Sequence, residues 1–277
     1  MKVLVTGANG FLGKEIVEHF STNDNIEIIS GTRSNLDLLD KTVVNEFFIN
    51  NKVDVVLHTA VQYGNTLKDF VANLAMFQNL SECSGKYGLM IYFGSGAEYD
   101  ITSDINQAKE EQVFNVMPTN YYGLAKNLMT REIVRTCKNI INLRLFGCFG
   151  PMEAETRYIA NSLNRIRSNK AITIHQDKQM DFMYVKDVMK VIKYTIDNNN
   201  GTTINGYSDI NLCYKKKFSL VDIAEIMRYT TSSKVPVDIL SKQVAPMYTG
   251  DPSRLLEMNL DLIGVEKGIK EVYDGIR

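Results

Sequence analysis

The chain has no tryptophan and few of the residues that mark specialised protein classes: 277 residues include 5 prolines, 4 cysteines and 3 histidines. The cysteines, Cys83, Cys137, Cys148 and Cys213, are widely spaced and form no Cys-x-x-Cys pair. This spacing favours buried reduced thiols over a disulfide framework or a metal site. No apolar run approaches the length of a membrane span, and a predicted strand directly follows Lys2, which leaves no room for a signal peptide. We therefore expect a cytoplasmic protein.

Neither sign of charge is in excess, since 31 Lys and Arg face 32 Asp and Glu for a net charge of −1. This balance gives no electrostatic basis for binding nucleic acid or an anionic membrane. With 44% hydrophobic residues the chain can bury the core of one large domain or of two connected ones. An anionic ligand must therefore be met by local groups.

A glycine-rich motif stands at the start of the chain, in KVLVTGANGFLGKEIVEHF (residues 2–20). A β-branched run at residues 3–6 precedes Gly7, Gly10 and Gly13, and apolar residues then recur at helical spacing. Glycines at this junction permit a tight turn, the approach of a phosphate, and close packing of helix on strand. The helix N-terminus offers free N–H groups to a pyrophosphate. The motif predicts a dinucleotide-binding site.

The end of the second predicted strand, in IEIISGTRS, indicates which cofactor binds. Folds that prefer NAD usually place an acidic residue here for the ribose 2′-hydroxyl. This chain has Thr32 and Arg33, which suit a 2′-phosphate, so we expect NADP, with NAD possible and an exposed loop arginine as the alternative. A third apolar strand at residues 53–60 completes the order strand, helix, strand, helix, strand. This order predicts an α/β protein with a Rossmann-like, doubly wound parallel sheet.

Candidate catalytic residues follow the next predicted strand. Ser95 lies beyond its carboxyl end, where ligands bind in open α/β sheets. The segment PTNYYGLAKN then carries two adjacent tyrosines, and on a helix Tyr122 and Lys126 share a face. Tyr121 points elsewhere and is expected to pack or to contact substrate. We predict that Tyr122 exchanges a proton with a substrate oxygen, that Lys126 lowers the pKa of Tyr122, and that Ser95 hydrogen-bonds the same oxygen.

Seven ordered segments resemble the extended short-chain dehydrogenase/reductase family, which contains sugar-nucleotide epimerases, dehydratases and reductases: VTGANGFLG, DLLD, HTA, FGSGAEY, YYGLAK, LRLFGCFGP and MDFMYVKDV. We expect residues 1–151, with part of 181–206, to form the dinucleotide-binding domain. Residues 152–180 and 207–277 are expected to form a smaller α/β substrate domain. The resemblance also implies a homodimer that pairs through the Tyr-x-x-x-Lys helix and its neighbour.

The resemblance further implies the ligand contacts. Ser95, Tyr122 and Lys126 match the catalytic set, and the last two also contact the cofactor. The other expected cofactor contacts are Gly7, Asn9, Gly10, Phe11, Leu12, Gly13, Thr32, Arg33, Asp37, Leu38, His58, Ala60, Asn73 and Phe146. The expected substrate contacts are Ser95, Gly96, Tyr121, Arg157 and Arg254.

Departures from the family pattern narrow the reaction. Gly96 and Ala97 stand where dehydratases of the family carry the two acids that drive water elimination. Reductases that also epimerise, such as GDP-fucose synthase, carry a cysteine at the place of Ala97 and a histidine at the place of Met152. Met180 replaces an arginine of the family, so the substrate phosphates need other cations. Arg157, Lys178 and Arg254 are the candidates, with an ordinary surface cation as the favoured alternative for each.

These departures leave hydride transfer without water elimination or coupled ring epimerisation. We expect NAD(P)H-dependent reduction of a nucleotide-linked 4-keto-6-deoxy sugar to the 4-hydroxy sugar, with Tyr122 as proton donor. Two alternatives stay open: a nucleotide-sugar C4-epimerase with tightly held NAD, and a non-catalytic NADP-binding regulator. The lack of an acid at Thr32 and Arg33 favours the reductase, because the epimerase retains NAD.

Overall fold

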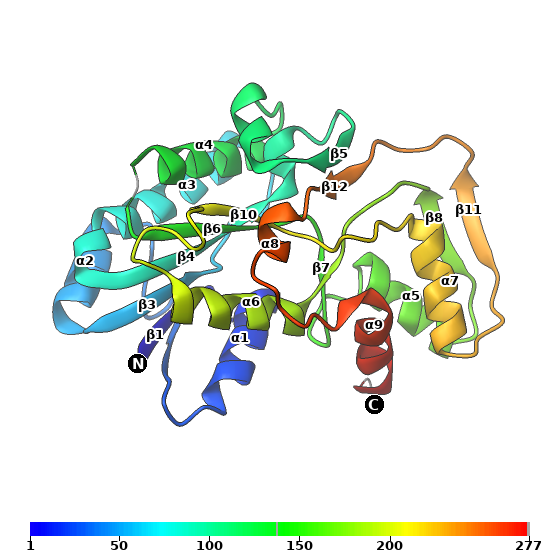
Figure 1. The fold of residues 1–277 in the computed structure, drawn as a ribbon, viewed down its shortest axis with the longest axis horizontal. Coiled ribbons are helices and arrows are strands. Elements are labelled where there is room, and N and C mark those ends of the chain that lie inside the picture. Colours follow the sequence, from blue (N-terminus) through cyan, green and yellow to red (C-terminus); the bar gives the residue numbers. More distant parts are fainter. Residues whose placement is uncertain (137, 276–277) are drawn as a thin grey trace.

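The central sheet dominates the structure, a computed structural model that describes residues 1–136 and 138–275. The central sheet has six strands in the order β2-β1-β3-β4-β6-β10 (Figure 1). Their bounds are β1 Lys2–Thr6, β2 Glu27–Gly31, β3 Val53–His58, β4 Tyr87–Ser95, β6 Ile140–Leu145 and β10 Asp209–Leu212. Every neighbouring pair is parallel, which confirms the predicted doubly wound α/β sheet.

Helices cover both faces of this sheet (Figure 1). One face carries α1 (Phe11–Ser21) and α6 (Val185–Asn198), and the other carries α2 (Lys41–Asn50), α3 (Leu67–Glu82) and α4 (Tyr121–Thr136). Alternate strand residues enter different cores: Val3 and Val5 pack on the α1 side, and Leu4 packs with residues of α2 and α3. Because both faces are buried, the strands carry apolar runs, as in residues 3–5, although β6 and β10 also bury Arg144 and Asp209.

A smaller lobe lies beyond the carboxyl ends of the central strands (Figure 1). Its main elements are α5 Tyr158–Arg167, β8 Ile172–Gln176, α7 Leu220–Thr230, β11 Val237–Ser241 and α9 Gly264–Gly275. Two short strand pairs and a one-turn helix connect it to the sheet: β5 Ile105–Ala108 with β12 Tyr248–Gly250, β7 Cys148–Phe149 with β9 Met183–Tyr184, and α8 Ser253–Leu256. The 3₁₀ helices are η1 Ser84–Lys86, η2 Gly96–Tyr99 and η3 Glu110–Asn115.

The division into two domains stays a prediction, but one strand departs from the expected boundary. β10 lies within the segment assigned to the substrate domain, yet it pairs with β6 in the central sheet, Asp209 opposite Asn142. A buried ion pair joins the same two strands, in which Arg144 of β6 donates to Asp209 at 2.7 Å.

The described cysteines are free thiols. Cys83 and Cys213 are buried and Cys148 is half-buried, whereas Cys137 lies outside the described residues.

Across 1–136 and 138–275, no helix is both long enough and apolar enough to cross a membrane.

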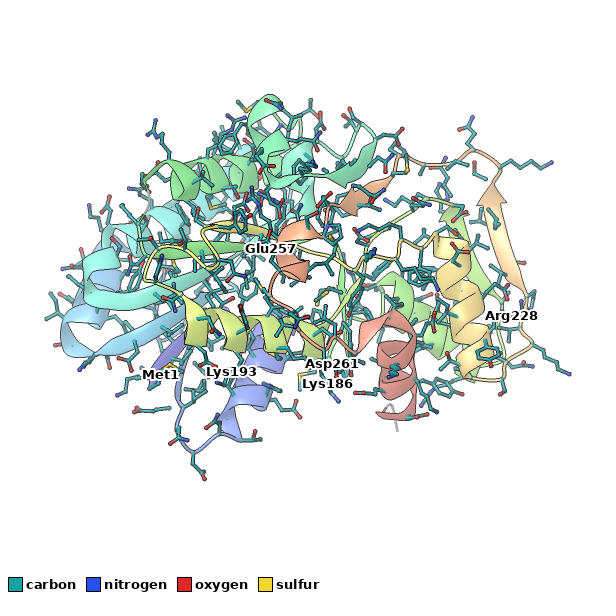
Figure 2. All side chains as sticks on the ribbon, viewed as in Figure 1. Met1, Lys186, Lys193, Arg228, Glu257 and Asp261 are labelled. Carbon is teal, nitrogen blue, oxygen red and sulfur yellow. The ribbon has the colours of Figure 1, made fainter. Side chains whose placement is uncertain are left out.

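A buried carboxylate joins α6 to the segment before α9. Asp187 accepts hydrogen bonds from the backbone N–H groups of Ile263 at 2.8 Å and Gly264 at 2.9 Å. It also accepts from the Tyr214 hydroxyl at 2.6 Å. Lys193, labelled on the same helix in Figure 2, is exposed instead. The fully buried Asp187 therefore satisfies three partly buried donors.

We expect Asp187→Ala to lower the free energy of unfolding by about 3 kcal/mol, because buried donors lose their partner. Asp197→Ala is the control on the same helix, since it removes only an exposed ion pair with Lys193 and should cost less than about 0.5 kcal/mol. Urea denaturation followed by circular dichroism measures both. Equal effects of the two substitutions would contradict this role of Asp187.

Candidate functional site

A cavity of about 960 Å³ opens at the carboxyl ends of the central strands. The chain order in β2-β1-β3 reverses at β1, and ligands of doubly wound sheets bind at this kind of switch point. The predicted residues that line the cavity are Gly7, Gly10, Phe11, Leu12, Gly13, Thr32, Arg33, Asp37, Leu38, His58, Ala60, Ser95, Tyr122, Lys126, Phe146 and Arg157. Residues from separate motifs thus meet in one place. Their individual roles stay predictions.

The glycine-rich turn between β1 and α1 has the shape that a pyrophosphate needs. Gly7 has φ +68°, and a Cβ there would lie 2.7 Å from the Cα of Ala60. A Cβ on Gly13 would lie 2.3 Å from the carbonyl oxygen of Gly7. At Gly10, the residue before α1, no side chain caps the first N–H groups of the helix. These N–H groups can therefore receive an anion, and the turn fits a dinucleotide.

The loop after β2 presents a cation. Arg33 lines the cavity, and its Nη2 donates to Oε1 of Gln62 at 3.1 Å. Asn73 holds the backbone of Gln62 from both sides, with its Oδ1 accepting from the N–H and its Nδ2 donating to the carbonyl, each at 2.9 Å. Asn73 does not line the cavity itself. Asn73 therefore supports the Arg33 side of the cavity indirectly, by holding Gln62.

The three predicted catalytic residues lie together at the centre of the cavity. Ser95 ends β4, and Tyr122 and Lys126 are one turn apart on α4. Lys126 is 7% exposed, and its Nζ donates to the carbonyl of Phe93 at 2.7 Å and lies 4.4 Å from the ring centre of Tyr92. Burial lowers the pKa of Lys126 to about 8.

The pKa of Tyr122 differs from the expectation. Burial raises it, and hydrogen bonding with Ser95 only partly opposes this. The expected lowering by Lys126 is wrong for this arrangement, because desolvation dominates and the ammonium is directed to the Phe93 carbonyl. Tyr122 is therefore held as the neutral phenol.

His58, at the end of β3, is a neutral part of the wall. Its Nδ1 lies 2.8 Å from the hydroxyl of Thr6. Burial, and secondarily the charge of Lys126, lowers the pKa of His58 to about 3. This imidazole is therefore uncharged at neutral pH.

Five predicted residues are not among those that line the cavity: Asn9, Asn73, Gly96, Tyr121 and Arg254. Tyr121 is 39% exposed, and its ring packs against Phe70 at 5.9 Å, which matches the packing alternative. Arg254 lines a separate cavity of about 200 Å³, pairs with Glu111, and donates to the backbone carbonyl of Asp209 at 2.7 Å. The structure therefore does not bring Arg254 to the catalytic residues.

Tyr248 is a residue of the site that the sequence did not indicate. Its hydroxyl lies 3.5 Å from Oγ of Ser95, and its ring packs edge-on against Phe146 at 5.3 Å. Nζ of Lys178 lies 5.6 Å from the same ring. Tyr248 arrives through the pairing of β12 with β5, which no local motif marks.

Glu153 also lines the cavity and was not predicted. Its side chain is 4% exposed, and its Oε1 lies 3.8 Å from Nε of Arg157. Burial raises the pKa of Glu153 to about 7. The sequence could have indicated Glu153 by its position two residues after Pro151, in a loop that leaves the end of the sheet on the side of the cavity.

We expect Arg33→Ala to raise the Kd for NADPH by roughly 10-fold or more, because a charge-assisted contact to the 2′-phosphate is lost. The Kd for NADH should hardly change. Arg135→Ala, at an exposed arginine of α4, is the control. Cofactor titration by fluorescence measures both nucleotides, and equal losses for NADPH and NADH would show that Arg33 does not read the phosphate.

Several relatives match most of the chain. GDP-6-deoxy-D-talose 4-dehydrogenase of Aggregatibacter actinomycetemcomitans is 24% identical over 277 residues, covering 93% of this chain and 91% of the relative. GDP-L-colitose synthase of Yersinia pseudotuberculosis is 26% identical over 225 residues, covering 72% and 73%. GDP-mannoheptose C4 reductase from Campylobacter jejuni, solved with NADP bound, has a TM-score of 0.83 at 20% identity, covering 99% and 97%.

A family model described as the NAD dependent epimerase/dehydratase family matches residues 3–213, well over half of the chain. This match confirms the predicted family and an NAD(P)-dependent enzyme, and the solved structures confirm the Rossmann-like fold. The chain therefore belongs to the NAD dependent epimerase/dehydratase family.

Proposed function

We propose that this protein reduces a nucleotide-linked 4-keto-6-deoxy sugar to the 4-hydroxy sugar with NAD(P)H. One observation carries the proposal: Ser95, Tyr122 and Lys126 share a cavity with the glycine-rich turn. The positions where related reactions need further acids or thiols hold Gly96 and Ala97. The side chains present therefore suit hydride transfer coupled to one proton transfer.

The space beside Ser95 argues against a dehydratase. A Cβ on Gly96 would lie 2.4 Å from Cδ1 of Phe146 and 2.8 Å from Cζ of Tyr248. Two aromatic rings thus occupy the space that an acidic side chain would need. Met152 stands at the place of the histidine found in reductases that also epimerise. It is 38% exposed, and its thioether has no titratable proton to transfer.

Each residue of the site has a separate role in the proposed reduction. Bound NAD(P)H supplies the hydride. Ser95, whose Oγ accepts from the N–H of Ala97 at 3.2 Å, can donate to the ketone oxygen. Tyr122 transfers its proton to the same oxygen as negative charge develops there. Burial favours Tyr122 as a protonated donor before the reaction, and the Lys126 ammonium can hold the ribose and stabilise the phenolate that remains.

The smaller lobe supplies the substrate side of the cavity. Arg157 and Lys178 line it and are cations that can meet a diphosphate, and Met180 lines it at the place of the family's arginine. Tyr248 presents a hydroxyl beside Ser95 for the sugar. The names of relatives with GDP-linked sugars support a GDP-linked substrate as the first to test.

A homodimer is part of this proposal, and the cytoplasmic location stays a prediction. Leu67 and Val71 of α3 are exposed apolar residues, and the ring pair of Phe70 and Tyr121 joins α3 to α4. An apolar surface on these two helices supports pairing through them. Analytical ultracentrifugation tests it.

The test of the function is the loss of NADPH absorbance with a panel of nucleotide-linked 4-keto-6-deoxy sugars, GDP-linked members first and NADH in parallel. Rapid oxidation with one member supports the reductase. Interconversion of C4 epimers without net use of added cofactor would favour the epimerase instead. Bound NADPH without turnover of any kind would favour a regulator.

We expect Tyr122→Phe to lower kcat by about 100-fold or more, because the proton donor is lost, while NADPH binding persists. The adjacent Tyr121→Phe is a matched control that should keep kcat. Stopped-flow turnover and cofactor fluorescence measure the two quantities. Survival of turnover in Tyr122→Phe would contradict the mechanism.

Tyr248→Phe should raise the KM for the sugar substrate by roughly 3- to 10-fold, because one hydrogen bond is lost. The ring contact with Phe146 remains, so the thermal midpoint should not change. Steady-state kinetics with differential scanning calorimetry checks both. An unchanged KM would show that the Tyr248 hydroxyl does not reach the sugar.

A further inference from the structure

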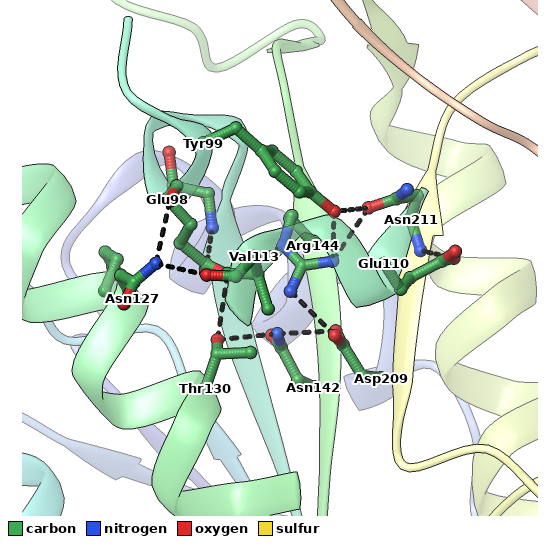
Figure 3. Close-up of polar contacts among 12 residues, drawn as sticks. Glu98, Tyr99, Glu110, Val113, Asn127, Thr130, Asn142, Arg144, Asp209 and Asn211 are labelled. Atoms are coloured by element: carbon green, nitrogen blue, oxygen red, sulfur yellow. Dashed lines mark hydrogen bonds and ion pairs between the residues drawn. The ribbon is translucent and has the colours of Figure 1, made fainter. Parts of the chain in front are cut away.

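Glu98 belongs to a buried polar network that also contains Thr130 and Arg144 (Figure 3). It belongs to η2 and is 0% exposed. One carboxylate oxygen, Oε1, accepts from the backbone N–H of Ser95 at 2.8 Å. The other, Oε2, accepts from the hydroxyl of Thr130 at 2.9 Å and from Nε of Arg144 at 2.7 Å. A single side chain thus contacts the Ser95 turn, helix α4 and strand β6.

The contact with α4 lies next to the predicted catalytic residues. Thr130 follows Lys126 by one helical turn, and Lys126 follows Tyr122 by one turn. The backbone carbonyl of Glu98 also accepts from Nδ2 of Asn127 at 2.9 Å, and Asn127 is the neighbour of Lys126. Glu98 therefore determines how the Ser95 turn sits on the part of α4 that carries Tyr122 and Lys126.

A second buried cation lies one helical turn from the Glu98 contact. Arg144 pairs with Glu98 and with Asp209, each at 2.7 Å, so one cation faces two carboxylates. Lys126 is also buried, lies one turn before Thr130 on α4, and its charge interacts with that of Glu98. Burial lowers the pKa of Lys126 and the charge of Glu98 opposes this. Burial raises the pKa of Glu98 itself, and Arg144 opposes that.

Other titratable groups around Glu98 respond differently to pH. The groups that face it from the packed elements are Tyr92, Tyr99, Tyr122, Lys126, Arg144, Asp209 and Tyr248, and Glu110 interacts with Asp209 further along the network. Burial raises the pKa of each of the four tyrosines, so they stay neutral near pH 7. Burial also raises the pKa of Glu110 to about 7, but this carboxyl pairs with Arg254 and the N–H of Asn211.

We propose that Glu98 is a positioning residue, which holds the Ser95 turn against α4 through Thr130 and Asn127 and whose negative charge favours the ammonium form of Lys126 one turn away. The proposal deepens the proposed function and rests on it only for its kinetic test. Glu98 does not touch the reacting atoms. It acts through Ser95 and Lys126.

Two substitutions separate its contributions. Glu98→Gln keeps the size and removes the charge. Because an ammonium without its counter-charge loses its proton more easily, the alkaline limb of the kcat/KM profile should move to lower pH by about one unit. Glu98→Asp keeps the charge but is shorter by one methylene. It should lower the plateau by about 10-fold without moving the limb.

Glu110→Gln is the matched control, because it removes another buried carboxyl of the same network that does not contact Ser95 or α4. It should leave the alkaline limb where it is in the wild type. An unshifted limb in Glu98→Gln, or an equal shift in Glu110→Gln, would overturn the proposal. If Glu98→Gln does not fold, an undiminished plateau in Glu98→Asp would overturn it as well.

A second readout does not need turnover. The pKa of Lys126 is followed by NMR of protein labelled with ¹³C-lysine, its signal assigned with Lys126→Arg. We expect this pKa to fall in Glu98→Gln and to stay in Glu110→Gln. A wild-type protein that turns over no sugar refutes the proposed function alone, whereas an unchanged pKa of Lys126 in Glu98→Gln refutes the role of Glu98.

Discussion

The structure depends on one buried cation, the Arg144 guanidinium. It is fully buried, and a charge in that position is tolerated only when it is paired and hydrogen-bonded. Its partners come from distant parts of the chain: Glu98 after β4 and Asp209 of β10. These pairs attach β10 to the edge of the central sheet and join the Ser95 turn to β6. Strand order and catalytic geometry thus share one electrostatic constraint.

The site combines two halves with different origins. The half for the cofactor is built from contiguous segments, in which Gly7 and Gly13 leave room for backbone contacts closer than any side chain allows. The half for the substrate is assembled from the smaller lobe. Tyr248 enters it through the pairing of β12 with β5, and its ring, with that of Phe146, occupies the space beside Gly96. In the proposed reaction, the same packing that excludes an acid there leaves Ser95 and Tyr122 as the groups at the reacting oxygen.

Local patterns predicted the fold class and most of the cavity lining, because strand alternation, glycine turns and one-turn helical spacing act within a few residues. Ser95, Tyr122 and Lys126 were predicted in this way and lie together. The pKa of Tyr122 was not, since desolvation depends on all the atoms packed around the phenol. Arg254 was misplaced for a similar reason: its charge is taken up by Glu111, which lies far from it in the chain.

The sequence by itself determined the parallel sheet, the dinucleotide turn and the spacing of the catalytic pair on α4, because each depends on backbone preferences and short periodicities. Only the tertiary structure decided that Glu98 is an internal anchor, that β10 joins the central sheet, and that Tyr248 faces Ser95. These arrangements follow from burial and from contacts between distant segments: Arg144 pairs with Glu98, 46 residues before it, and with Asp209, 65 residues after it. No local pattern records which buried charges will meet.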